Sequence, residues 1–154
     1  MQKLPGEEPQ PRERKSTDPG QDKRLQLQSE SGTFAGSLAL LANELVKEIC
    51  HGPCADMQGR PMQMVCRGKD HHSLVLSWME TLLYVLDEQQ VALSDIRVQV
   101  TQTLHLSAHC RARSITGKRL LMPTGVDAAS ARAVETESGL WQSQCTLLMG
   151  LERG

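Results

Sequence analysis

The stretch from Asp70 to Leu93, DHHSLVLSWMETLLYVLDEQQVAL, decides the fold of this chain. Its apolar residues recur at steps of three and four, which predicts one broad buried face of an α-helix. Asp70 and Ser73 can each cap the helix, because their side-chain oxygens accept free amide hydrogens of a first turn. The polar residues 87–90 are expected to end the helix. Trp78 and Tyr84 belong to a small set of aromatic residues (Trp 2, Tyr 1, Phe 1), so much bulky packing surface is expected here.

The composition fits one soluble domain. The chain has 154 residues, of which 39% are hydrophobic and 23% charged, enough to bury a core. Its formal net charge is −1, so no global field draws it to nucleic acid or to a membrane. A role on RNA would have to act through a protein partner or a small local patch, and no direct contact with nucleic acid is predicted.

The chain is expected to be a cytoplasmic monomer. Its apolar runs are too short to cross a bilayer, and its N-terminus lacks the apolar core of a signal peptide. The cysteine count is 5, an odd number that favours reduced thiols. Residues 1–23 are rich in proline and charge and poor in apolar side chains, which predicts a disordered tail. A partner-binding arm is the alternative for this segment, and residues 24–154 are expected to form the domain.

Strand and helix patterns alternate through that domain. Residues 24–30 alternate apolar and polar, as a half-buried strand does. Thr33 can cap a helix that ends near Cys50, before His51-Gly52-Pro53. One face of this helix would carry the apolar residues Phe34, Leu38, Leu41, Leu45 and Ile49.

More strands are expected around the central helix. Residues 60–67 precede it, and the alternating runs 96–100 and 104–110 follow it as an antiparallel pair or as one long bent strand pair. Residues 130–137 and 141–151 close the chain as two strands, with a turn at Ser138-Gly139. The order predicts an α+β domain with two helices on one face of a curved, mostly antiparallel sheet of about five to seven strands.

The segment Cys50-His51-Gly52-Pro53-Cys54 suggests a zinc site. A structural zinc site usually needs a second pair of ligands at recognisable spacing, and Cys66, His71 and His72 do not supply one. A helix-terminating turn with buried thiols is therefore the favoured interpretation, and a small zinc-binding protein is the alternative.

No catalytic constellation stands out. His105 and His109 share one face of a predicted strand, whereas Cys110 points to the other face, so the three do not converge on one ion. Cys110 is expected to be buried and inert, and Met62, Met64, Met79 and Met149 are expected to fill the core. The sequence has neither a phosphate-binding glycine loop nor a nucleophile elbow. We expect an accessory or binding protein rather than an enzyme.

At the central helix the chain resembles the archease family. A typical member reads SLL…WLNELLYL.D where this chain reads SLVLSWMETLLYVLD, and residues 25–46 and 132–136 resemble the family's first strand, first helix and a late strand. The matching positions of the helix motif are Gly68, Asp70, Ser73, Leu74, Trp78, Glu80, Leu82, Leu83, Tyr84, Asp87 and Ser94. The resemblance covers about residues 24–151. It implies an archease-like fold, a role in tRNA processing and tRNA splicing as an RNA ligase activator, and an RtcB-type RNA ligase as partner.

The resemblance fails where family members bind a divalent metal such as calcium. They open with His-Thr-Ala-Asp and carry an Asp in the last strand, and these positions fall at Arg24 and Gly150, while a family His falls at Met122. A hard cation needs several oxygen ligands, so no metal-binding residue is expected. No catalytic or cofactor-binding residue is expected either. Asp22 (or Asp18) and Glu152 are conceivable substitutes, but Arg24 would repel the ion.

Two functions follow from this resemblance. The first is an archease-like accessory protein that assists the ligase by metal-independent docking. The second is a degenerate archease-fold interaction module with no role in RNA ligation, whose partners would be unrelated to RNA repair.

Overall fold

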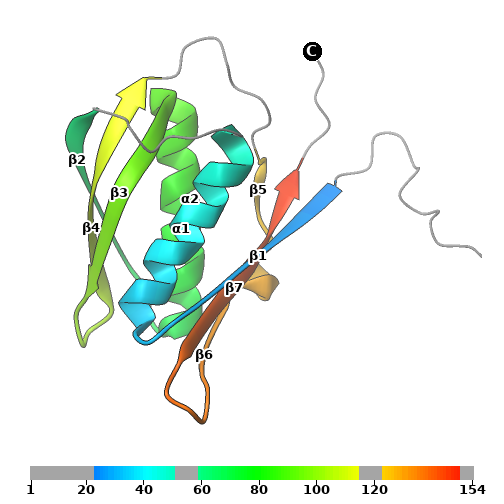
Figure 1. Cartoon of the computed structure of the whole chain (residues 1–154). Helices are drawn as coiled ribbons and strands as arrows, with labels where there is room; N and C mark the ends of the chain where they lie inside the picture. Colours follow the sequence, from blue (N-terminus) through cyan, green and yellow to red (C-terminus); the bar gives the residue numbers. More distant parts are fainter. Residues whose placement is uncertain (1–22, 51–58, 115–122, 150–154) are drawn as a thin grey trace, which may run out of the picture.

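The computed structural model describes residues 23–50, 59–114 and 123–149, and the tail and the Cys50–Cys54 segment proposed above lie outside them or at their boundary. Within these ranges the chain forms two α-helices and seven strands (Figure 1). Their order is β1 (Lys23–Ser31), α1 (Phe34–Cys50), β2 (Arg60–Arg67), α2 (His71–Gln89), β3 (Val91–Val100), β4 (His105–Ser114), β5 (Gly125–Val126), the 3-10 helix η3 (Ala128–Ser130), β6 (Arg132–Glu135) and β7 (Trp141–Met149).

The caps of both helices form where the sequence places them. At the start of α1 the Thr33 hydroxyl accepts a hydrogen bond from the Gly36 amide at 2.9 Å. At the start of α2 the Asp70 carboxylate accepts from the Ser73 amide at 2.8 Å, and the Ser73 hydroxyl accepts from the Asp70 amide at 3.0 Å. Asp70 is therefore the cap, and Ser73 closes a reciprocal capping box.

The helix α2 ends within residues 87–90, as expected. Residues 87–89 form its last turn, and Gln90 ends it in a left-handed conformation with φ 54°. The strand β3 begins at the next residue, Val91, whereas the strand was expected from residue 96. No glycine or proline separates the two elements, and so the local pattern does not reveal where the strand begins.

The strands form two antiparallel sheets that enclose the helices (Figure 1). One is four-stranded, with β1, β7 and β5 in order and β6 also paired to β7, and the other is three-stranded, in the order β2-β4-β3. Both helices pack against both sheets. This confirms the α+β class with mostly antiparallel strands, and it adds that the strands divide between two sheets.

The core lies where the apolar helix faces meet. Leu38, Leu41 and Leu45 of α1 are buried. The apolar stripe of α2 is also buried and consists of Leu74, Val75, Trp78, Met79, Leu82, Leu83, Val85 and Leu86. Trp78 has no exposed surface and donates a hydrogen bond from Nε1 to the Leu38 carbonyl at 3.0 Å. Tyr84, in contrast, is 66% exposed. It lies six residues from Trp78, which turns it about 120° away around the helix, so the packing surface expected of it is not used.

The C-terminal region is less regular than its sequence pattern suggests. The expected strand at 130–137 shortens to β6, because Ser130 ends the 3-10 helix η3. Neither η3 nor the two-residue strand β5 was expected. The turn at Ser138-Gly139 is confirmed, with Gly139 at a φ of 86° that favours glycine. Among the described residues, neither helix combines the length and the hydropathy that a membrane crossing requires.

Candidate functional site

Arg24, the residue at the first family metal position, lies near the start of β1. It pairs with Leu148 of the central strand β7, and Gly125 of β5 pairs with the same residue from the other side. The Leu25 and Leu27 side chains point towards the helices, so Arg24 points to the outer face of the sheet, where it is exposed.

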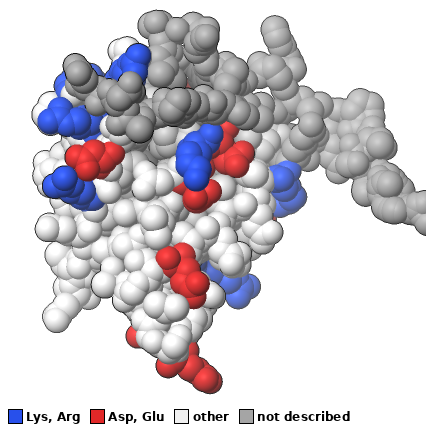
Figure 2. Space-filling model, viewed as in Figure 1, with Lys and Arg blue, Asp and Glu red and all other residues white. Residues whose placement is uncertain are grey.

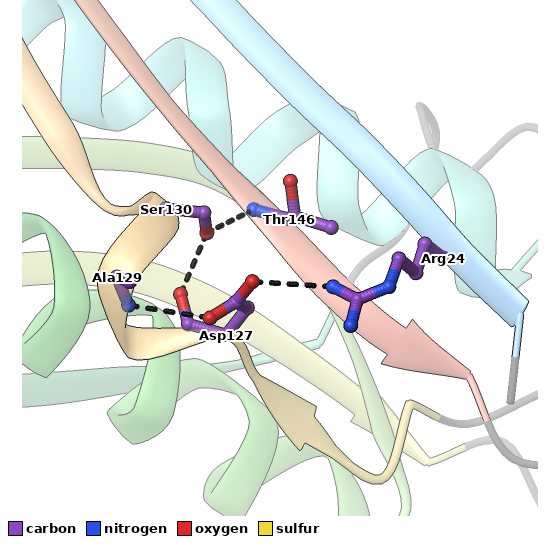
Figure 3. Close-up of polar contacts among 5 residues, drawn as sticks. All are labelled: Arg24, Asp127, Ala129, Ser130 and Thr146. Atoms are coloured by element: carbon purple, nitrogen blue, oxygen red, sulfur yellow. Dashed lines mark hydrogen bonds and ion pairs between the residues drawn. The ribbon is translucent and has the colours of Figure 1, made fainter.

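From there Arg24 reaches across β7 to Asp127 (Figure 3). Its Nη1 lies 3.1 Å from Asp127 Oδ2, in an ion pair between residues 103 positions apart. The other carboxylate oxygen of Asp127 accepts from the Ala129 amide at 3.3 Å and so caps η3. Asp127 is thus held from two directions.

A short hydrogen-bond chain fixes the Asp127 segment on β7. The Asp127 amide donates to the Thr146 carbonyl at 2.9 Å. The Ser130 hydroxyl donates to the Asp127 carbonyl at 2.6 Å and accepts from the Thr146 amide at 2.7 Å (Figure 3). This carboxylate was not singled out from the sequence. The only local signal is an Asp followed three residues later by Ser, which is a common capping arrangement.

The described residues around Arg24 do not fit a divalent cation. A hard cation needs several oxygen ligands held together, whereas Asp127 is the one carboxylate that pairs with Arg24 among them. Among all residues that the structure describes, no three His, Cys, Asp or Glu side chains form a metal-ligating group. The positions Gly150 and Met122 and the substitutes Asp22 and Glu152 lie outside the described residues, so their part of the expectation stays a prediction.

The two consecutive histidines of α2 have structural contacts of their own. The His71 ring stacks on Trp141 at a centroid distance of 4.9 Å and meets the edge of Phe34 at 4.7 Å. The Nδ1 atom of His72 accepts a hydrogen bond from the Ala133 amide at 3.0 Å, which joins α2 to β6. The structure therefore turns His71 and His72 towards packing rather than towards Cys66 on β2.

The β4 residues lie as the strand pattern predicts. His105 and His109 are both exposed on one face, and Cys110 is buried on the other. Burial raises the pKa of the Cys110 thiol to about 11, with the nearby charge of Asp95 as a smaller cause. Burial alone raises the pKa of Cys145 to about 12. Both side chains are therefore thiols at neutral pH, not nucleophilic thiolates.

The family motif on α2 divides into a buried and an exposed set. Trp78, Leu82 and Leu83 are buried, so packing in the core accounts for their presence in the motif. Glu80, Tyr84 and Asp87 are exposed, at steps of four and three that place them on one stripe of the helix. We call these three residues the α2 stripe. Packing of the core does not account for their presence.

Gly68 of the same motif has a steric reason. A Cβ atom there would lie 2.5 Å from the amide nitrogen and 2.7 Å from the Cα of Leu74. Glycine therefore lets β2 pass close to the first turn of α2, and this match supports the fold rather than a site.

Comparisons with known proteins bear on the fold alone. No protein-family model and no curated protein matches the sequence. Among solved structures, the solution structure of Methanobacterium thermoautotrophicum protein 1598, a structural-genomics target, superposes with a TM-score of 0.60 at 12% identity, covering 81% of this chain and 91% of that chain. The match supports an archease-like fold.

Proposed function

We propose that this protein is an archease-like accessory protein that docks onto an RtcB-type tRNA-splicing RNA ligase in the cytoplasm, without a metal ion and without catalytic residues of its own. The observation that carries this proposal is the α2 stripe. The sequence resembles the family at Glu80, Tyr84 and Asp87, and these are the exposed motif residues apart from Asp70, whose role as the cap of α2 accounts for its presence. Exposed aromatic residues are frequent energetic centres of protein interfaces.

The Arg24–Asp127 pair supports the metal-independent part. A guanidinium at 3.1 Å from the carboxylate already balances its charge. A docking surface on α2 needs no ion in that position. The family's metal chemistry therefore forms no step of this proposal.

The docking test uses the full chain and the cognate ligase, with a chelator present throughout. Binding is measured by pull-down and by titration without RNA, and stimulation by multiple-turnover RNA joining with and without this protein. We expect binding in the chelator and faster turnover. An absence of both binding and stimulation would overturn the proposal in favour of an interaction module unrelated to RNA ligation.

A matched pair of variants locates the surface. Tyr84→Ala removes a side chain that is 66% exposed, and Leu40→Ala removes one on α1 that is 44% exposed, so neither change opens a core cavity. We expect Tyr84→Ala to weaken ligase binding by at least tenfold, about 1.4 kcal/mol, and Leu40→Ala to leave it unchanged. Equal effects of the two variants would rule out the α2 stripe as the docking surface.

A further inference from the structure

The outer face of the three-stranded sheet carries arginine on each of its strands. The alternate side chains of β2, β4 and β3 that do not enter the core point to this face. They include Arg67 from β2, Arg97 from β3, and Arg111 and Arg113 from β4, all of them exposed. We call these four residues the arginine face. His105 and His109 of β4 lie among them.

The register spreads these cations across the whole sheet. Arg67 is paired with His105 at one end, Arg97 with His109 in the middle, and Arg111 with Ser94 beyond it. From His105 to Arg113 the strand β4 rises about 26 Å at roughly 3.3 Å per residue. A ligand with one negative charge could meet one of these arginines, but only an extended polyanion could meet them all.

The charge of this face differs from that of the chain as a whole. The formal net charge of the protein is −1, yet the one acidic residue on this face among the described strands is Asp95, at the bulge of β3, 3.3 Å from Arg97 Nε. The acidic residues of the helices and of the β6–β7 hairpin lie elsewhere. Figure 2 shows basic atoms beside acidic ones at the edge of the view where β3 and β4 lie, and acidic atoms at the hairpin tip.

We propose that the arginine face binds the phosphate backbone of base-paired RNA, without regard to sequence. Guanidinium groups form paired hydrogen bonds with phosphate oxygens. The described outward residues of these strands include no Phe, Tyr or Trp, and their aromatic rings are the imidazoles of His105 and His109. They therefore offer no row of large rings on which successive unpaired bases could stack. A backbone ligand needs no such platform. The choice of RNA rather than DNA rests on the proposed function.

An acidic protein fits this face less well. Protein interfaces are organised around buried aromatic or apolar anchors, and this face offers Pro61 and Val65, the latter 66% exposed. An extended peptide would add to the sheet at an edge strand, through backbone hydrogen bonds. A face presents side chains only, as a phosphate backbone requires.

The test measures binding of a fluorescently labelled 20-base-pair RNA duplex to the full chain alone, by anisotropy, with no ligase present. We expect a dissociation constant of about 1–100 µM at 50 mM NaCl. Between 50 and 200 mM NaCl the logarithm of affinity should fall with the logarithm of salt with a slope of about −3, as three to four phosphate contacts predict. A failure of ligase docking would leave this measurement unaffected.

Two matched double variants locate the binding. Arg67→Gln with Arg113→Gln removes two cations of the face, and Lys47→Gln with Arg132→Gln removes two exposed cations elsewhere. We expect the first to weaken binding about tenfold and to reduce the salt slope by about two, one per contact, and the second to change neither. Circular dichroism of both variants verifies that they are folded.

Three outcomes would overturn the proposal. They are no binding up to about 100 µM protein at 50 mM NaCl, equal losses in the two double variants, and competition by polyglutamate as strong as that by unlabelled RNA duplex. The last would make the partner an acidic protein. Tighter binding of single-stranded RNA or of a DNA duplex would contradict the assignment to base-paired RNA.

Discussion

Ser37 of α1 and Ser143 of β7 share a hydrogen bond of 2.7 Å between their hydroxyl oxygens, and both residues are fully buried. The Ser37 hydroxyl also donates to the Phe34 carbonyl at 2.7 Å. Since a hydroxyl has one hydrogen, Ser143 must be the donor to Ser37. The pair therefore ties the first helix to the four-stranded sheet with a defined direction.

This direction predicts unequal costs for the two alanine variants. Ser37→Ala leaves the buried Ser143 donor without its acceptor and should cost about 1–3 kcal/mol. Ser143→Ala leaves the Ser37 donor satisfied and should cost about 0.5–1.5 kcal/mol. The double variant should cost less than the sum. Urea unfolding of the three variants measures this, and a larger loss in Ser143→Ala would reverse the assigned direction.

The Trp78 contact makes a second prediction about stability. Trp78→Ala removes a side chain with no exposed surface and should lower the free energy of unfolding by about 3–5 kcal/mol. Trp78→Phe keeps most of the volume and loses the hydrogen bond to Leu38, so its cost should be smaller. Tyr84→Ala, at an exposed position of the same helix, should change the stability by less than about 0.5 kcal/mol. Similar losses at 78 and 84 would contradict the packing described.

The central helix could be predicted from sequence because its packing repeats the period of its own residues. Trp78 and Leu82 are buried on the face that steps of three and four define. The start of β3 at Val91 could not be placed, because the helix passes into a strand with no intervening glycine or proline. The division into two sheets depends on which strands pair, and β2 lies beside β4 rather than β3. Alternation within a strand carries no information on its neighbour.

The candidate site was predictable only in part, for a related reason. The alternating pattern of residues 24–30 predicts the face of the strand on which the Arg24 side chain lies. Its partner Asp127 lies 103 positions away, and no local pattern joins the two. The exposure of Tyr84 could not be predicted from the sequence either, since a tyrosine within an apolar helical run suits a core as well as a surface.

The buried thiols predict how stability changes in alkaline solution. The pKa of Cys145 rises from 9.0 to about 12 in the folded protein, so the folded state holds its proton more firmly than the unfolded state. This contribution is complete below pH 9, declines as the pH rises, and is lost by about pH 12. Cys145→Ala should therefore show a shallower loss of stability above pH 9 than the parent chain, measured by urea unfolding at several pH values. An unchanged slope would contradict the buried position of this thiol.

The same burial predicts slow thiol modification. Cys110 and Cys145 should react with a thiol reagent at pH 8 far more slowly in the folded chain than in urea, because the thiolate is the nucleophile. The fraction protected is measured by mass spectrometry of the labelled peptides. Rapid labelling of Cys145 without denaturant would show that the four-stranded sheet opens easily.

The Arg24–Asp127 pair allows a direct test of why this chain is expected to lack the family's metal. The pair is exposed, with side-chain exposures of 63% and 35%, so Arg24→Ala should cost less than about 1 kcal/mol. Arg24→Asp restores a carboxylate at the family position and places it beside Asp127. The two negative charges should repel and lower the stability of this variant further.

Calcium distinguishes the parent from this variant in thermal unfolding. A cation that binds only the folded state stabilises it by about 2.7 kcal/mol at a hundredfold excess over its dissociation constant. We expect no rise in the melting temperature of the parent with millimolar calcium or magnesium, and a rise in Arg24→Asp that disappears when Asp127→Asn is added. The added variant removes one ligand charge while keeping the side-chain shape, so it isolates the carboxylate pair. A calcium-dependent rise in the parent chain would show that residues other than Arg24 and Asp127 hold an ion, and that the loss of metal binding inferred from Arg24 is wrong.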